Sequence, residues 1–150
     1  MRRMIFWGLA LCAALPLSAN ERPAPVEAMV YRSPACGCCK KWVEHLQANG
    51  FAVKDIVKDD MAAVKRELGV PENLASCHTA VIGGYRIEGH VPAADVRKLL
   101  EAKAPLLGLS VPGMPAGTPG MEAGGRRDAY RVVGFGPDGS VHAVHDYTGE

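Results

Sequence analysis

Three cysteines fall within four consecutive residues, Cys36-Gly37-Cys38-Cys39, between a strand-like segment and a helix-like segment. A thiol at a helix N-terminus has a lowered pKa, because the unpaired backbone N–H groups there favour negative charge. The thiolate is the form of cysteine that acts as nucleophile and as metal ligand. The motif therefore predicts a fold that presents a redox or soft-metal site at the end of its first strand.

Residues 1–19 have the pattern of a secretory signal peptide. Two arginines precede the apolar run 5–17, and Leu17-Ser18-Ala19 resembles an A-x-A cleavage site. The run is shorter than the roughly 20 residues that cross a bilayer. Acylation at Cys12 is disfavoured, because it would leave an apolar region of about half the usual length. We expect an exported mature protein with no membrane anchor.

The charge balance argues against nucleic acid as a partner. The sequence has 17 basic and 16 acidic residues, and removal of Arg2 and Arg3 leaves 15 basic residues against 16 acidic ones. No cluster of basic residues suited to phosphates occurs. The length and the apolar fraction of 48% predict one domain with a hydrophobic core, which we place at residues 26–147.

Apolar periodicity and turn residues divide the chain into alternating strands and helices. We expect strands at 26–31, 51–57, 79–82 and 85–88, and helices at 38–49, 60–68 and 92–104. This β-α-β-α-β-β-α order is that of the thioredoxin-like fold, which belongs to the α/β class. That fold keeps its active site at the end of the first strand, where the cysteine motif lies.

The remainder of the chain has a different character. Residues 105–125 are rich in Pro, Gly and small residues, so we predict a loop without helix or strand. The segments 130–135 and 140–147 flank Gly136-Pro137-Asp138-Gly139, which is a strong turn signal. A C-terminal β-hairpin is therefore expected after the loop.

Two chemical interpretations of the cysteine motif stay open. Cys36 and Cys39 have the C-x-x-C spacing of thiol–disulfide oxidoreductases, in which Cys36 would attack and Cys39 resolve. Cys38 gives such an exchange no evident benefit. Metal binding would use all three thiolates and add Cys77 and His78, which are adjacent in the sequence. Sulfur and imidazole ligands in this proportion suit copper(I) best.

Two structural alternatives are less favourable. A pair of structural disulfides among the four cysteines is disfavoured, because Cys38 and Cys39 are neighbours and a bond between them closes a strained ring. A tetrahedral zinc site is usually built from two separated C-x-x-C pairs, whereas here three thiols stand against one.

Further soft ligands are predicted outside the cysteines. His90 stands at the start of the third expected helix, close in the assumed fold to the segment that carries Cys77. Met114 and Met121 each lie in a Pro-Gly turn, where the usual role of methionine as core filler is disfavoured. His142 and His145 lie three apart in an expected strand, so we predict that they point to opposite faces and share no ion.

Four segments, in order, resemble a family formerly classed as a domain of unknown function, which includes the periplasmic copper-resistance proteins called CopG. The similarity covers nearly all of the mature chain. The segments are Tyr31-Arg32-Ser33-Pro34-x-Cys36-Gly37-Cys38-Cys39-x-x-Trp42, Ser76-Cys77-His78-Thr79-Ala80, Glu88-Gly89-His90-Val91-Pro92-Ala93 and Gly108-Leu109-x-Val111-Pro112-Gly113-Met114-Pro115-x-Gly117-x-Pro119-Gly120-Met121-Glu122.

The resemblance implies a thioredoxin-like periplasmic domain that binds several copper ions through the Cys-x-Cys-Cys cluster. Interconversion of Cu(I) and Cu(II) is an activity that the resemblance suggests without establishing. The metal ligands that it implies are Cys36, Cys38 and Cys39, supported in falling order by Cys77, His78, His90, Met114 and Met121.

The sequence as a whole predicts a periplasmic copper-binding protein of copper resistance, which holds more than one Cu(I) ion in a multi-thiolate site. A copper oxidoreductase activity stays open. The alternatives are a thiol–disulfide oxidoreductase that uses Cys36 and Cys39, and a metallochaperone that hands copper to periplasmic partner proteins. A Cys38→Ser variant separates them, because it should cripple a copper cluster and spare the exchange pair.

Overall fold

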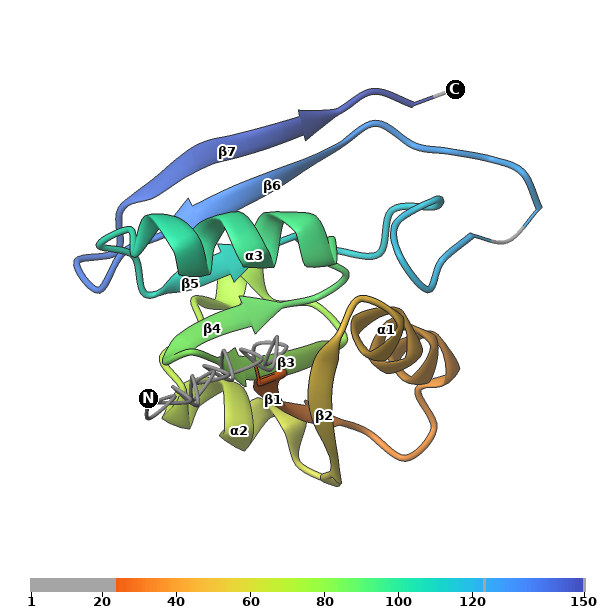
Figure 1. Ribbon diagram of the computed structural model, residues 1–150, viewed down its shortest axis with the longest axis horizontal. Coiled ribbons are helices and arrows are strands. Elements are labelled where there is room, and N and C mark those ends of the chain that lie inside the picture. The colour runs from red at the N-terminus through yellow and green to blue at the C-terminus, as the bar shows by residue number, and fades with distance from the viewer. Residues whose placement is uncertain (1–23, 123, 150) are drawn as a thin grey trace, which may run out of the picture.

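The computed structural model describes residues 24–122 and 124–149, which form one mixed sheet with helices packed against it (Figure 1). The mixed α/β class predicted from the sequence is confirmed. The predicted signal peptide, with Cys12, lies outside the described residues. Among the described helices, none combines the length and the hydropathy that a membrane span requires.

Eleven elements follow one another along the described chain. They are β1 (Val26–Arg32), α1 (Gly37–Ala48), β2 (Phe51–Val57), α2 (Met61–Glu67), the 3₁₀ helix η1 (Glu72–Leu74), β3 (His78–Ile82), β4 (Tyr85–Glu88), α3 (Ala93–Ala102), β5 (Gly108–Ser110), β6 (Tyr130–Phe135) and β7 (Val141–Tyr147).

The seven strands are ordered β2-β1-β3-β4-β5-β6-β7 in a single sheet. The pairs β1–β2 and β4–β5 are parallel, and the other neighbours are antiparallel. Side chains alternate between the two faces of a strand. On one face, Val30 of β1 and Ile82 of β3 join a core with α1 and α3. On the other face, Thr79 of β3 bonds Lys65 of α2.

Local sequence explains how α1 begins and what it buries. Cys36 is the N-cap, because its Sγ accepts a hydrogen bond from the backbone N–H of Cys39 at 3.3 Å. Trp42 and Leu46 are fully buried one turn apart. The indole Nε1 of Trp42 also donates to the carbonyl of Val91 at 2.9 Å, which ties α1 to the segment before α3.

The strand β5 contradicts the prediction that residues 105–125 contain no strand. It is only three residues long, and pairing on both sides creates it, because β4 and β6 flank it. A Cβ at Gly108 would clash with the backbone carbonyl of Arg86, so glycine permits this close pairing. The same glycine made the segment look like a loop, because glycine weakens strand propensity.

A β-bulge in the final hairpin overturns the predicted orientation of two histidines. The register between β6 and β7 shifts at Val132/Val133, so that His145 pairs with Val132 and His142 with Gly134. Val132 and Gly134 are two residues apart on β6, and paired residues share a face. His142 and His145 therefore lie on the same face of the sheet, whereas a regular strand would have separated them.

Candidate metal centre

The register of the sheet brings three distant segments to one place. Antiparallel pairing sets Arg32, at the end of β1, beside His78, at the start of β3. The first turn of α1 with its cysteines follows β1, so it lies close to Cys77 and His78. The end of β4 borders the same point, because the N–H of Gly89 donates to the carbonyl of His78 at 3.0 Å. His90 follows directly after this glycine.

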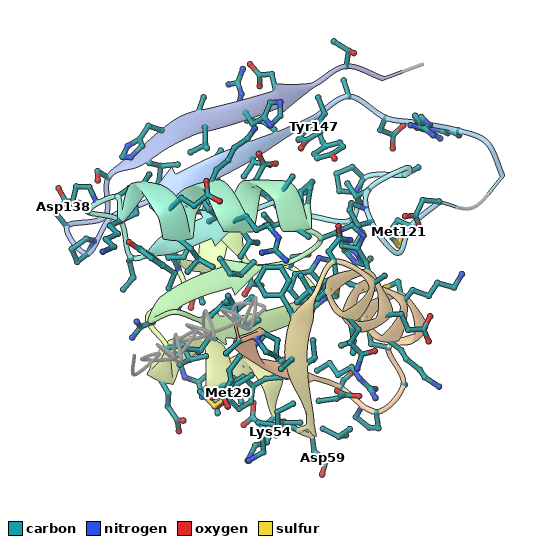
Figure 2. All side chains as sticks on the ribbon, in the orientation of Figure 1. Met29, Lys54, Asp59, Met121, Asp138 and Tyr147 are labelled. Atoms are coloured by element: carbon teal, nitrogen blue, oxygen red, sulfur yellow. A yellow bond between two sulfur atoms is a disulfide. The ribbon has the colours of Figure 1, made fainter. Side chains whose placement is uncertain are left out.

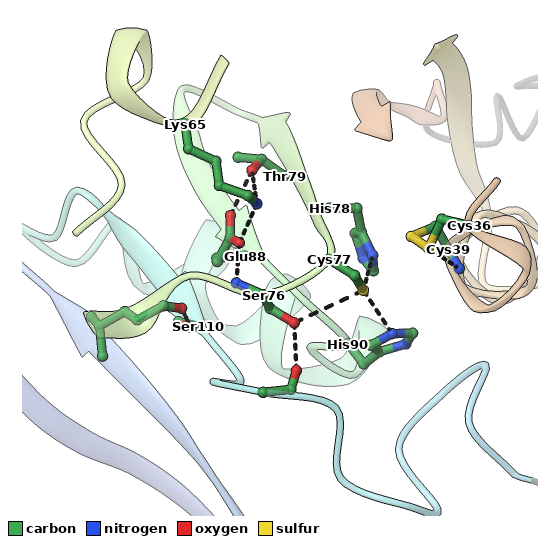
Figure 3. A network of polar contacts seen from close by, with 12 residues as sticks. Cys36, Cys39, Lys65, Ser76, Cys77, His78, Thr79, Glu88, His90 and Ser110 are labelled. Carbon is green, nitrogen blue, oxygen red and sulfur yellow. Dashed lines mark hydrogen bonds and ion pairs between the residues drawn. A yellow bond between two sulfur atoms is a disulfide. The ribbon is translucent and has the colours of Figure 1, made fainter. Parts of the chain in front are cut away.

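Six side chains gather there in two groups of potential metal ligands. In the first group, one ligand atom from each side chain lies within 4.8 Å of the others, and its members are Cys36, Cys38, Cys39 and Cys77. The second group meets the same limit and consists of Cys77, His78 and His90. Cys77 belongs to both groups. Figure 3 shows its sulfur between the two imidazoles, on the side that faces α1.

The sulfur atoms are in two chemical states. A disulfide joins Cys36 and Cys39, whose Cα atoms are 5.3 Å apart, whereas Cys38 and Cys77 are free thiols. The Sγ of Cys38 lies 3.5 Å from that of Cys36. The bonded pair is the one with C-x-x-C spacing. In this state the first group has two free thiols, and the second group is complete.

The tautomer of His90 is set by the protein. Its Nδ1 lies 2.7 Å from the carbonyl oxygen of Pro119, which can only accept, so Nδ1 carries the proton. Nε2 then presents its lone pair 3.2 Å from the Sγ of Cys77. A hydrogen bond from the other ring nitrogen to a carbonyl is the usual support of a metal-binding histidine.

His78 is fully buried and its Nε2 has no hydrogen-bond partner among the described residues. Its Nδ1 lies 3.2 Å from the Sγ of Cys77. Burial lowers the pKa of His78 well below its ordinary value, and the nearby His90 and Lys65 lower that pKa further. The ring is therefore neutral at pH 7. An unpaired buried nitrogen is costly to leave without a ligand.

Burial also shifts the pKa values of the other two members of the second group. It lowers the pKa of His90, against a smaller opposing effect of the hydrogen bond to Pro119. Burial, with a smaller contribution from the neighbouring Cys38, raises the pKa of the Cys77 thiol to about 11. Without a metal the site therefore holds neutral imidazoles and a protonated thiol. A metal ion would displace the thiol proton, because the thiolate is the ligand.

A buried carboxylate bonds the residues on both sides of Cys77 and His78. Glu88, which is fully buried, accepts the backbone N–H of Ser76 at 2.6 Å and the hydroxyl of Thr79 at 2.6 Å. Lys65 of α2 neutralises this carboxylate in an ion pair, with its Nζ 2.5 Å from Oε1 of Glu88. Sequence reasoning missed Lys65 and Glu88, because no local pattern links a helix lysine to a glutamate 23 residues later.

The loop that carries the two predicted methionine ligands borders the cluster. The Ser76 hydroxyl donates to the carbonyl of Gly113, directly before Met114, whose side chain is 56% exposed. A Cβ at Gly120 would lie 2.9 Å from the carbonyl oxygen of Cys38, so the loop packs closely on the first turn of α1. Figure 2 labels Met121, the next residue, beside α1. Ligation by the two thioethers stays a prediction.

The C-terminal histidines lie apart from these two groups. His145 places Nδ1 2.8 Å from Asp95 of α3, and the hydroxyl of Tyr147 donates to the same carboxylate at 2.7 Å. Asp95 is 2% exposed. His142 is exposed, and neither histidine belongs to a group of three or more metal-binding side chains within the described ranges.

Comparisons with known proteins agree with this geometry. A family model described as "Protein of unknown function, DUF411" matches residues 74–121, which include Cys77, His78 and His90. Two solved structures titled "Copper resistance protein copG", forms 2 and 1, are each 54% identical with a TM-score of 0.79. The alignments cover 82% and 83% of this chain, and 98% and 99% of those chains. A search of curated proteins finds no match.

Proposed function

Because the chain belongs to the family of the copper resistance protein CopG, we propose that it holds copper(I) in the two joined groups of cysteine and histidine ligands. Copper is the cargo in this proposal. The observation that carries it is the position of the Cys77 sulfur, within 4.8 Å of the ligand atoms of both groups. Thiolates and imidazoles together are the donor set that favours copper(I).

More than one ion per chain is proposed, because the two groups together offer four sulfurs and two imidazoles. One ion would leave several of these donors unused. A thiolate can bridge two metal ions, and Cys77 has the position for such a bridge. The Cys36–Cys39 disulfide removes two donors, so the fully reduced chain is the form with the largest capacity.

We infer a periplasmic location and a thioredoxin-like core as parts of the same proposal. The signal-peptide pattern of residues 1–19 supports export. The strand order β2-β1-β3-β4, with α1 joining two parallel strands, supports the thioredoxin-like arrangement. Delivery of the bound copper to a periplasmic partner protein is compatible with a site at the surface end of α1.

A thiol–disulfide oxidoreductase is the second candidate, and the bonded Cys36–Cys39 pair favours it. The two candidates differ in what they require of Cys38. A Cys38→Ser variant should lose copper capacity if the cluster is the functional unit. It should keep reductase activity towards a model disulfide if the Cys36–Cys39 pair acts alone.

The test is an anaerobic titration of the reduced mature protein with Cu(I), in competition with a chromogenic Cu(I) chelator. We expect more than one ion per chain, with the largest loss in Cys77→Ser, because this residue serves both groups. His90→Gln should also weaken binding. His142→Gln is its matched control, since His142 is exposed and outside both groups. Uptake of one ion or none by the reduced protein would refute the cluster.

A further inference from the structure

A cavity of about 360 Å³ lies between α3, β5 and β7, and none of the proposed copper ligands lines it. The helix and the strand are joined beside it, where the imidazole of His145 bonds the carboxylate of Asp95 (Figure 1). Most of the lining side chains are apolar, and these are Leu99, Ala102, Ala104, Leu106, Leu109 and Val144. The cavity is therefore an apolar space outside the copper site.

The bulge in β7 shapes one wall of this cavity. Val144 and His145 are consecutive and both line the cavity, whereas neighbours on a regular strand point to opposite faces. A Cβ at Gly134 of β6 would lie 3.1 Å from Cγ2 of Val144 and 2.8 Å from Cδ1 of Leu106. The missing side chain on β6 thus leaves room for both residues. Bulges often redirect side chains in this way beside functional sites.

The polar side chains that line the cavity gather at one end of it. His145 and Lys98 both approach Asp95, with nitrogen–oxygen distances of 2.8 and 3.8 Å. The two oxygens of Asp95 already accept hydrogen bonds from His145 and Tyr147, and this side chain is only 1% exposed. The Lys98 ammonium is too far from Asp95 for a hydrogen bond, and its side chain is 69% exposed. Lys98 is therefore the charged group that a ligand can reach.

We propose that this cavity binds a small amphipathic carboxylate, a fatty acid of medium chain length. Its alkyl chain lies between α3 and β7, and its carboxylate pairs with the ammonium of Lys98. The proposal does not depend on copper binding, because the cavity and the copper cluster share no lining residue. It adds a second binding site to the chain.

The size and the walls of the cavity select the alkyl chain. Ligand cavities in proteins range from about 300 to about 1,000 Å³, so this one suits a small ligand. A water molecule takes about 30 Å³ of liquid, and the cavity thus offers room for roughly a dozen atoms of that size. A carboxylate with about eight carbons fits this space. The apolar walls give water few hydrogen bonds, so an alkyl chain displaces that water favourably.

The charge at the polar end selects the head group. An ammonium head group would meet the like charge of Lys98, and both oxygens of Asp95 already have donors. A carboxylate instead meets an accessible cation of opposite charge. Complementary charge of this kind sets which ligand binds more than how tightly it binds. We therefore expect the site to prefer a carboxylate to an amine with the same alkyl chain.

The experiment titrates the mature protein with octanoate, below the concentration at which octanoate forms micelles, by isothermal titration calorimetry. We expect saturable binding of one octanoate per chain and weaker binding of octylammonium. Lys98→Met keeps the aliphatic stem and removes the charge. It should weaken octanoate binding by about two- to fivefold, as for loss of an exposed ion pair, and leave octanol binding unchanged.

A second variant fills the cavity. Ala102 is the last residue of α3 and is exposed, so Ala102→Phe can place its ring in the cavity without disturbing the core. We expect this variant to lose octanoate binding. Ala48→Phe is the matched control, because Ala48 is the exposed last residue of α1 and does not line the cavity. It should bind octanoate as the wild type does.

Four outcomes would overturn the proposal. The first is the absence of saturable octanoate binding, and the second is equal affinity for octanoate and octylammonium. The third is normal binding by Ala102→Phe in protein shown to be folded by circular dichroism, which would place octanoate elsewhere. The fourth is a wild-type dimer in sedimentation that Ala102→Phe abolishes and that binds no octanoate. A second copy of the chain would then cover the cavity.

Cu(I) titration of the same variants separates this proposal from the proposed function. Ala102→Phe and Lys98→Met should keep the wild-type Cu(I) stoichiometry, since neither residue belongs to the ligand groups. Failure of the protein to bind Cu(I) would refute the proposed function and leave octanoate binding untouched. Failure to bind octanoate would refute only the fatty-acid site.

Discussion

Two polar clusters near the start of α3 contain similar side chains and differ in how the protein satisfies them. The first consists of Cys36, Cys38, Cys39 and Cys77 with His78 and His90, and we call it the copper cluster after the ion that we propose it binds. The second, the hairpin cluster, consists of Asp95, His145 and Tyr147. In the hairpin cluster both carboxylate oxygens have partners, at 2.8 and 2.7 Å. In the copper cluster the buried Nε2 of His78 has no hydrogen-bond partner within the part of the chain that the structure describes.

The difference teaches that the presence or absence of hydrogen-bond partners, more than residue type, separates a structural cluster from a ligand site. Buried polar groups in folded proteins are nearly always paired. The Asp95 carboxylate joins α3 to β7, and it raises the pKa of Tyr147 in addition to the larger effect of burial. The ring of Tyr130 stacks on that of Tyr147, with 4.5 Å between the ring centroids. The copper cluster instead brings soft donors together, and such donors could hold a metal ion.

The largest loss of stability should come from breaking the ion pair between Lys65 and Glu88, next to the copper cluster. Lys65→Met leaves Glu88 buried and without its counter-ion, and breaking a buried pair in this way costs about 3–5 kcal/mol. Because Glu88 also accepts the N–H of Ser76, we expect weaker Cu(I) binding at Cys77 as well. Urea unfolding of the reduced apoprotein and the chelator competition measure the two effects.

The matched control is Lys98→Met, since Lys98 approaches Asp95 at 3.8 Å but its side chain is 69% exposed. An ion pair whose cationic partner is this exposed and this distant contributes about 0–1 kcal/mol. If the two variants lost similar amounts of unfolding free energy, breaking the buried Lys65–Glu88 pair would be no more destabilising than breaking the Lys98–Asp95 pair. A Lys65→Met protein that unfolds more easily but binds Cu(I) normally would show that Glu88 does not position Cys77.

A smaller effect, confined to stability, is expected in the hairpin cluster. Asp95→Ala removes the acceptor of both His145 and Tyr147, and each lost hydrogen bond contributes about 0.5–1.5 kcal/mol to stability. Cu(I) stoichiometry should not change. Asp146→Ala is the control, because its bond to Arg131 is exposed and of little energetic value. Loss of copper binding in Asp95→Ala would contradict this prediction, because it would show that the hairpin cluster affects the copper cluster.

The sequence predicted those features that depend on neighbouring residues. The bounds of β2 and β4 agree with the expected strands, because alternation and the Gly83-Gly84 turn are local signals. The short strand β5 was missed because its partners β4 and β6 create it. The bulge in β7 was missed because a one-residue register shift has no sequence signature in this hairpin.

The same limit applies to the two polar clusters. The cysteine motif and Cys77 could be named as candidate ligands from residue type and from family resemblance. Their proximity depends on pairing of β1 with β3, which lies beyond a local pattern. The partners of Glu88 and Asp95 come from α2 and β7, at long separations in sequence. No periodicity could have identified them.

The smallest predicted effect concerns His45, which links α1 to the start of α3 beside both clusters. The ring of His45 is partly buried, and its Nε2 accepts the backbone N–H of Ala93 at 3.1 Å. Burial lowers its pKa, against a smaller opposing effect of Glu122. The neutral ring is therefore the form that caps α3, since a protonated nitrogen cannot accept.

The sign of the pH dependence follows from that lowered pKa. The unfolded chain takes up the His45 proton at about pH 6.5, before the folded chain does, so this contribution to stability is present above that pH and is lost as the pH falls through the folded pKa. It should not exceed about 1.5 kcal/mol, the value of one neutral hydrogen bond. His45→Gln, compared with wild type in urea between about pH 7.5 and about pH 5, isolates it, because His78 and His90 titrate in both proteins. A difference in unfolding free energy that stays constant across this range would show that the His45 ring does not cap α3.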